Sequence, residues 1–254
     1  MTSPLIVANW KMHGDQAHCA LLARQITRGL RREPASVEVV LAPPFTSLEV
    51  VRRSLRGSTV KLAAQNCHWE AQGAYTGEVS PVMVRELGCD YVIVGHSERR
   101  HILHESDEMI ARKLSPIVRH GMRAILCVGE TLDQRHTGKT SAVIRRQLRI
   151  ALKGLTKADI ANIEIAYEPV WAIGTGQNAT PKQINHVHSR IRVWLMQWFG
   201  SSAGKPLRIL YGGSVKPENV NSLVAIKEIN GLLVGGASLK SETFLPIIRA
   251  FSQK

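Results

Sequence analysis

Short apolar segments recur along the chain and alternate with longer stretches in which apolar residues return every three or four positions. Eight of the short segments are rich in valine, isoleucine, leucine and alanine. They span residues 6–10, 37–42, 60–64, 91–94, 124–128, 163–167, 208–211 and 231–234. Each is a continuous apolar run with little polar alternation, which is typical of parallel strands covered on both faces.

The stretches between these segments have a helical period. Residues 16–31, 107–120 and 181–198 are the clearest, and the last begins with a proline at a favourable first helical position. Eight strand–helix alternations in 254 residues predict a closed (β/α)8 barrel, with residues 1–254 forming a single domain. An open, doubly wound sheet of eight strands has the same spacing and stays open as the alternative.

The composition is that of an ordinary globular protein, with 44% hydrophobic and 21% charged residues. The first residues lack the basic start and apolar stretch of a signal peptide, and no window is long and apolar enough to span a membrane. We therefore expect a soluble, cytoplasmic protein with no membrane partner. Its four widely spaced cysteines fit reduced, buried thiols; a nucleophilic Cys127 is the alternative.

The formal net charge of +13 is the unusual feature of the composition. Such a charge suits nucleic acid, an acidic membrane surface or small anionic substrates. However, the basic residues are spread over several predicted helices and are not interleaved with aromatic residues. We therefore expect a basic, solvated surface and no nucleic-acid partner.

Polar residues follow the predicted strands, where (β/α)8 barrels carry their functional groups. Glu168 ends the segment 163–167 and precedes Pro169, which favours extended geometry at the strand tip. An apolar tip follows, bounded on its far side by Gly174 and Gly176. This pattern predicts a base beneath an exposed apolar lid that closes and expels water.

His96 follows the fourth strand and precedes a predicted helix that begins at Glu98, with Ser97 as its N-cap. The positive potential of a helix N-terminus should keep this imidazole neutral, so that it can donate a hydrogen bond to a substrate oxygen. Asn9 and Lys11 follow the first strand and can stabilise negative charge. Taken alone, Lys11 is better interpreted as a solvated surface lysine.

Paired glycines follow the last two strands, as Gly212-Gly213-Ser214 and Gly235-Gly236. Their backbone N–H groups predict a phosphate cradle, which is frequent after strands seven and eight of such barrels.

Two other motifs have the wrong context. A G-x-G-x-x-A match begins at Gly174, but it is separated from its strand and no acid near position 197 can bind a ribose. His101, His104 and Glu105 lack a recognised zinc spacing and are interpreted as helix surface. We expect no metal and no dinucleotide cofactor.

Seven motifs, in this order and spacing, resemble the triosephosphate isomerase family over nearly the whole chain. They are Ala-Asn-Trp-Lys-Met (8–12), Gln-Asn (65–66), Tyr-Thr-Gly-Glu (75–78), Val-Gly-His-Ser-Glu-Arg-Arg (94–100), Ala-Tyr-Glu-Pro-Val-Trp-Ala-Ile-Gly-Thr-Gly (166–176), Tyr-Gly-Gly-Ser (211–214) and Leu-Val-Gly-Gly-Ala-Ser (233–238).

The resemblance implies interconversion of dihydroxyacetone phosphate and D-glyceraldehyde 3-phosphate, in glycolysis and gluconeogenesis, without a cofactor. It implies that Glu168 moves a proton between neighbouring carbons through an enediolate and that His96 polarises the oxygens. Lys11 and Asn9 would stabilise the negative charge, and Glu98 would have a secondary, orienting role.

The resemblance also implies that the amides of Gly174, Ser214, Gly235 and Gly236 hold the substrate phosphate.

Family members usually form homodimers through a long loop after the third strand, and the loop from Gln65 to Glu78 fits this description. The resemblance places Thr76 at its tip and directs Glu78 toward Arg99 of the partner subunit. His13 departs from the family, which commonly has asparagine there. We expect this change to affect the dimer interface, or its pH dependence, more than catalysis.

Two other functions remain open. A paralogous isomerase of a four-carbon phosphoketose would need the same acid–base groups, because one more carbon changes only the depth of the pocket. A catalytically silent basic dimer is the alternative from another class. The joint presence of Lys11, His96 and Glu168 argues against it.

Overall fold

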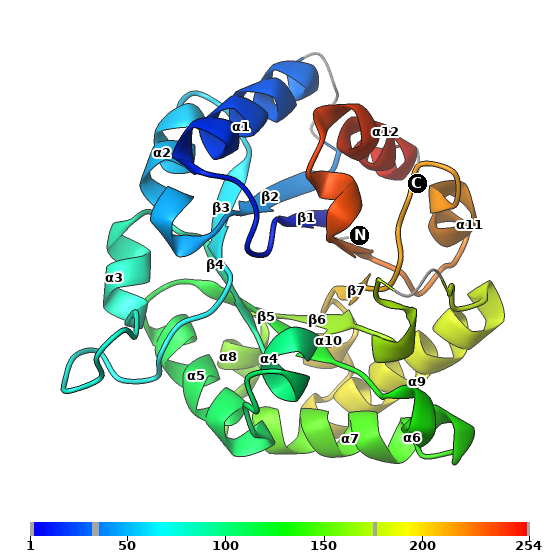
Figure 1. The fold of residues 1–254 in the computed structure, drawn as a ribbon. Helices are drawn as coiled ribbons and strands as arrows, with labels where there is room; N and C mark the ends of the chain where they lie inside the picture. Colours follow the sequence, from blue (N-terminus) through cyan, green and yellow to red (C-terminus); the bar gives the residue numbers. More distant parts are fainter. Residues whose placement is uncertain (1–2, 32–35, 175–176, 253–254) are drawn as a thin grey trace.

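The computed structural model describes residues 3–31, 36–174 and 177–252. Its centre is a parallel barrel whose strands pair in chain order (Figure 1). The strands are β1 (Leu5–Asn9), β2 (Glu38–Ala42), β3 (Lys61–Ala64), β4 (Tyr91–Val94), β5 (Arg123–Val128), β6 (Ile163–Tyr167), β7 (Ile209–Tyr211) and β8 (Gly231–Val234). Because β8 pairs with β1, the sheet has no edges and the predicted barrel is confirmed over the open sheet.

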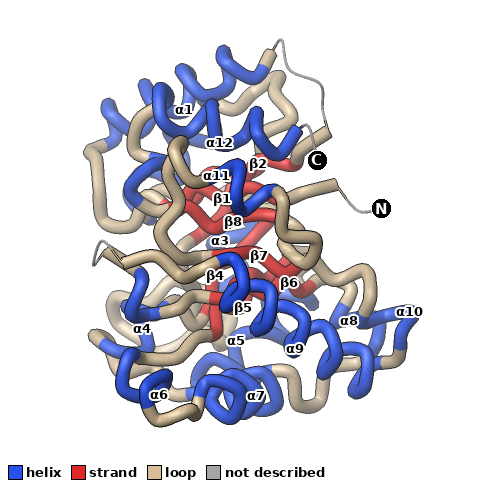
Figure 2. The backbone as a smooth tube through the Cα atoms, turned by 90° about the vertical axis from the view of Figure 1, so that its right-hand side faces the viewer, coloured by secondary structure: helices blue, strands red, loops and turns tan. Residues whose placement is uncertain are grey.

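The helices surround the strands, as the side view in Figure 2 also shows. They are α1 (Gln16–Leu30), α2 (Leu48–Ser54), α3 (Pro81–Glu86), α4 (Ser97–His101), α5 (Asp107–Arg119), α6 (Leu132–His136), α7 (Thr140–Ala151), α8 (Lys157–Ile160), α9 (Pro181–Phe199), α10 (Ser201–Gly204), α11 (Val220–Val224) and α12 (Ser241–Ser252). Short 3-10 turns cover η1 (Phe45–Ser47), η2 (Val170–Ala172) and η3 (Gly236–Ser238). The three helices predicted most clearly, α1, α5 and α9, are confirmed. In the described ranges, no helix combines the length and apolarity that a bilayer span needs.

Two apolar layers explain why the strands are continuously apolar. Leu5 and Val7 of β1 belong to a small cluster of strand residues, whereas Ile6 and Ala8 belong to the large cluster shared with the helices. Successive side chains of a strand point to opposite faces. Both faces of each strand are therefore covered, one by the barrel interior and the other by the helices.

All four cysteines are free and buried. Burial, followed by the nearby charge of Glu168, raises the pKa of the Cys127 thiol well above its usual value of 9.0. A thiol held protonated in this way is a poor nucleophile, so Cys127 belongs to the core.

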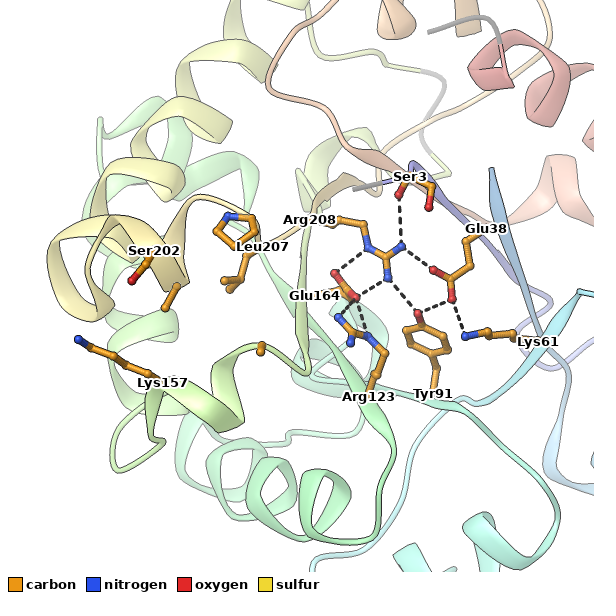
Figure 3. A pocket seen from close by; sticks show the side chains of 13 residues that line it. Ser3, Glu38, Lys61, Tyr91, Arg123, Lys157, Glu164, Ser202, Leu207 and Arg208 are labelled. Carbon is orange, nitrogen blue, oxygen red and sulfur yellow. Dashed lines mark hydrogen bonds and ion pairs between the residues drawn. The ribbon is translucent and has the colours of Figure 1, made fainter. Parts of the chain in front are cut away.

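A charged network that the sequence patterns do not reveal closes the N-terminal end of the barrel (Figure 3). Arg208, immediately before β7, donates to both oxygens of Glu164 at 2.6 and 3.1 Å and to Glu38 at 2.6 Å. It also donates to the hydroxyl of Tyr91 at 2.9 Å. A cavity of about 550 Å³ opens beside this network. It lies at the opposite end of the strands from the predicted functional loops.

Candidate active site

A cavity of about 340 Å³ lies at the C-terminal ends of the strands. Every residue predicted to be catalytic or to bind substrate lines it, while Glu98 contacts two of the lining side chains. The predicted residues that line the cavity are Asn9, Lys11, His96, Glu168, Gly174, Ser214, Gly235 and Gly236. Thr175 and Gly176 of the predicted lid lie outside the described residues.

Glu168 is held from several sides directly after β6. Its N–H donates to the carbonyl of Val128 at 2.8 Å, and its side chain is almost completely buried. One carboxylate oxygen accepts from the N–H of Ser97 at 2.9 Å, and the other lies 3.0 Å from Nε2 of His96. Burial disfavours the ionised form, but His96 and the Ser97 N–H outweigh it and lower the pKa of Glu168. The group is therefore a carboxylate.

Two glycines allow the main chain to come close to Glu168. A Cβ atom on Gly129 would overlap the carbonyl oxygen of Glu168, and one on Gly212 would lie 2.9 Å from its Cγ. The overlap at Gly129 is with main chain, so no side-chain rotation can relieve it, and a Cβ atom on Gly212 would displace the side chain of Glu168. Gly129 and Gly212 therefore set the position of the carboxylate.

His96 itself caps helix α4, which corrects the prediction that Ser97 is the N-cap. The Nδ1 atom of His96 accepts from the N–H of Glu98 at 3.3 Å, and the helix begins at Ser97. An accepting Nδ1 carries no proton, so the neutral ring is protonated at Nε2. That N–H points toward Glu168. Capping by the imidazole also frees the Ser97 N–H to bind Glu168.

The electrostatic surroundings of His96 include a carboxylate that the prediction did not place there. Burial lowers the pKa of His96, but the charge of Glu168 and the hydrogen bond to it prevail and raise the pKa above the usual 6.5. Sequence patterns identify the helix N-terminus, which favours the neutral ring, but they do not reveal that the base lies in contact with the imidazole. The charge of Glu168 therefore opposes the effect of the helix N-terminus, while the accepting Nδ1 atom fits a neutral ring.

Lys11 has a left-handed backbone, with φ at 52°, which is uncommon outside glycine. Asn9 Oδ1 accepts from the Lys11 N–H at 3.1 Å, and the side-chain amide of Gln65 donates to the Lys11 carbonyl at 2.7 Å. The ammonium group lies 2.6 Å from Glu98. Gln65 is thus a supporting residue that was predicted only as part of the dimer loop.

The prediction of an exposed apolar tip after Glu168 is wrong for the described residues. Trp171 is half-buried, its indole N–H donates to Glu130 at 3.1 Å, and the Arg135 guanidinium stacks on its ring. Ala172 is fully buried. An apolar segment in a loop is exposed only if no other part of the protein covers it. Here the buried carboxylate of Glu130, from another loop, binds the Trp171 indole.

Much of the remaining lining of the cavity is rich in glycine. Gly174, with φ at 70°, Ser214 and the two glycines after β8 all line it. Gly236 begins the turn η3. His13, which the resemblance assigned to the dimer interface, is exposed and also lines this cavity.

The histidine and acidic residues after α4 do not form a metal site. Glu105 is buried and pairs with Arg99 at 2.8 Å and with Lys113. His104 lies in a left-handed turn after α4 and not on the helix surface that was predicted. Throughout the ranges that the structure describes, no group of three or more histidine, cysteine or acidic residues is placed to hold a metal ion.

Comparison with known proteins agrees with this geometry. The family model described as triosephosphate isomerase matches residues 4–251. The chain belongs to the triosephosphate isomerase family. A triosephosphate isomerase of Caldanaerobacter subterraneus subsp. tengcongensis is 47% identical over 248 residues, which cover 98% of this chain and 99% of the relative. One from Syntrophotalea carbinolica is 48% identical over 249 residues, with 98% of each chain covered.

A third triosephosphate isomerase, from Roseiflexus sp., is 48% identical over 248 residues, or 98% of this chain and 97% of the relative. The matches to these triosephosphate isomerases include both ends of the barrel, so they extend well beyond the motifs around the cavity. The resemblance inferred from seven short motifs is confirmed at the level of the family.

Proposed function

We propose that this chain interconverts dihydroxyacetone phosphate and D-glyceraldehyde 3-phosphate without a cofactor. The chain belongs to the triosephosphate isomerase family, and one observation on its structure supports the proposal most directly. Glu168, His96 and Lys11 line a single cavity whose remaining lining is rich in glycine.

Glu168 acts as the base. It takes a proton from the carbon beside the carbonyl while the bonding electrons move to the carbonyl oxygen, which gives an enediolate. The proton then returns to the neighbouring carbon, while His96 passes the hydroxyl proton of the enediolate from one oxygen to the other, so no atom or electron is gained or lost. To reach carbon, the carboxylate must exchange its contacts with His96 and the Ser97 N–H for contact with the substrate.

This exchange also prepares His96. Glu168 is the main cause that raises the pKa of His96, so its departure favours the neutral ring. The Nε2–H can then donate to the substrate oxygen that gains charge. The Lys11 ammonium and the Asn9 amide stabilise the same charge, and Glu98 orients Lys11 through its 2.6 Å contact.

The amides of Gly174, Ser214, Gly235 and Gly236 bind the phosphate. Backbone N–H groups at turns and helix starts suit this role because they are fixed in place and have no charge of their own to neutralise. Ile173 and Gly174 line the cavity beside Glu168, which supports a covering role for this segment.

A coupled assay on both candidate substrates tests the proposal. We expect turnover of the triose phosphates with a kcat/KM at least about tenfold above that for a four-carbon phosphoketose, because an additional carbon must fit a cavity of about 340 Å³. Faster turnover of the four-carbon substrate would support the paralogous isomerase. Absence of both activities in a folded protein would support the silent basic dimer.

We also propose that the chain functions as a homodimer. Several large apolar side chains are exposed on the loops after β1, β2 and β3, on α3 and after α4. They are Met12, Phe45, Tyr75, Val82, Met83, Ile102 and Leu103. An exposed set of this kind is typical of an interface. The set includes Tyr75 from the loop between Gln65 and Glu78, as expected from the family.

The four buried, free thiols fit the predicted cytoplasmic location.

The variant Met83→Lys/Ile102→Lys should shift the protein from dimer to monomer, because two buried ammonium groups would face the partner. Met83 and Ile102 are 50% and 68% exposed in the isolated chain. Sedimentation velocity measures the change. Val193→Lys is the matched control, since Val193 is 43% exposed but lies on α9. Equal sizes for all three proteins would contradict this interface.

A further inference from the structure

A second cavity, outside the barrel, is lined by four arginines. It has a volume of about 370 Å³ and is bounded by Arg24, Arg28, Arg31 and Arg53, with Thr27 and Ser54 completing the lining. Helices α1 and α2, which pack against each other, supply most of these residues, and both lie on the periphery in Figure 1. None of the six residues lines the active-site cavity.

The local sequence explains how the arginines come together. Arg24, Arg28 and Arg31 follow one another at spacings of four and three, which places them on one face of a helix. Helix α1 contains no acidic residue that could neutralise them. Packing of α2 then brings Arg53 from a distant part of the sequence, so the apparent scatter of basic residues hides a local concentration.

Among the residues that the structure describes, most of the positive charge around this cavity has no partner. No described carboxylate lines the cavity, and of the four arginines only Arg53 has an ion pair, with Glu49, which it shares with Arg52. Within the described residues, Arg24, Arg28 and Arg31 make no ion pair, whereas Arg99, Arg100 and Arg208 each pair with a carboxylate. Like charges four residues apart destabilise a helix. The helix dipoles favour Arg28 in the last turn of α1 and Arg53 in the last turn of α2, but they do not account for Arg24.

We propose that this cavity binds a small anion that carries adjacent phosphate groups. Guanidinium groups present paired donors that match phosphate oxygens, and several of them can share one chain of phosphates. The volume is close to the 340 Å³ of the active-site cavity, which suits a small molecule.

Isothermal titration calorimetry with inorganic tripolyphosphate tests the site. Saturating glycerol 3-phosphate is present throughout, so that the phosphate cradle of the active site is occupied. We expect one equivalent to bind, and the double variant Arg28→Gln/Arg31→Gln should weaken binding at least about tenfold. The matched control is Arg145→Gln/Arg149→Gln, which removes the same charge from α7 at a similar spacing. It should change the affinity less than about twofold.

Three results would overturn the proposal. One is that the wild type does not bind tripolyphosphate under these conditions. Another is an equal loss of affinity in both double variants, which would mean that only net charge matters. The third is tighter binding of a DNA oligonucleotide that depends on the same two arginines. Isomerase activity should be unchanged in both variants, so this site and the catalytic proposal can fail independently.

Discussion

Glu168→Gln should lower kcat/KM for the triose phosphates by about 10³-fold, because the amide keeps the shape of the side chain but cannot accept the substrate proton. The affinity for glycerol 3-phosphate should stay within about threefold, since backbone amides of other lining residues hold the phosphate. A coupled assay and a titration measure the two effects. Glu168→Asp should also lose much of the rate, because its shorter arm misplaces the base.

The matched control is Glu98→Gln, which removes a carboxylate from the same motif. Glu98 contacts Lys11 and His96 but does not line the cavity, so its loss should cost less than that of Glu168. If Glu168→Gln turned over the triose phosphates at the wild-type rate, another group would have to be the base.

Arg208→Met should destabilise the fold by about 3–5 kcal/mol, because it removes the guanidinium that pairs with both Glu164 and Glu38 and leaves the buried Glu164 with Arg123 alone. Denaturant unfolding at fixed protein concentration measures the loss, since the stability of an oligomer depends on concentration. Arg146→Met is the control. Arg146 also pairs with a carboxylate, but its side chain is 57% exposed, so we expect a change of less than about 1 kcal/mol.

The same variant should alter the acid dependence of stability. Burial works against ionisation of Glu38, but hydrogen bonds from Arg208 and Tyr91 and the charge of Arg208 lower its pKa from 4.5 to about 2. A pKa lowered by folding contributes stability above the unfolded value, and this contribution is lost as the pH falls. The difference in unfolding free energy between wild type and Arg208→Met should therefore become smaller as the pH falls from about 4.5 to 2. If this difference did not change with pH, Arg208 would not be the group that lowers the pKa of Glu38.

The barrel follows from the sequence because the same rule holds for every strand. Each strand is covered on both faces, so it is continuously apolar, and the predicted ends differ from the observed ones by one residue at most. The predicted site residues lie together for a related reason. Parallel strands in a barrel end at the same face, so polar residues that follow different strands converge.

Contacts between loops are the features that the sequence does not predict. Whether His96 or Ser97 caps helix α4 depends on a small difference in capping preference between these two neighbours. The raised pKa of His96 depends on the distance between its ring and the Glu168 carboxylate. Trp171 is covered by Glu130, which belongs to another loop. The arginine cavity and the network around Arg208 also unite residues from distant segments, for which periodicity has no signal.

Gly129 and Gly212 have a practical consequence for changing the substrate range by directed evolution. A side chain at Gly129 would overlap the main chain of Glu168 and one at Gly212 would displace its side chain, so libraries that randomise these positions would consist mainly of members with a misplaced base. Ile173 and Leu239 line the same cavity with replaceable aliphatic surface. Libraries restricted to such positions would vary the fit for new sugars while the proton-transfer machinery remained intact.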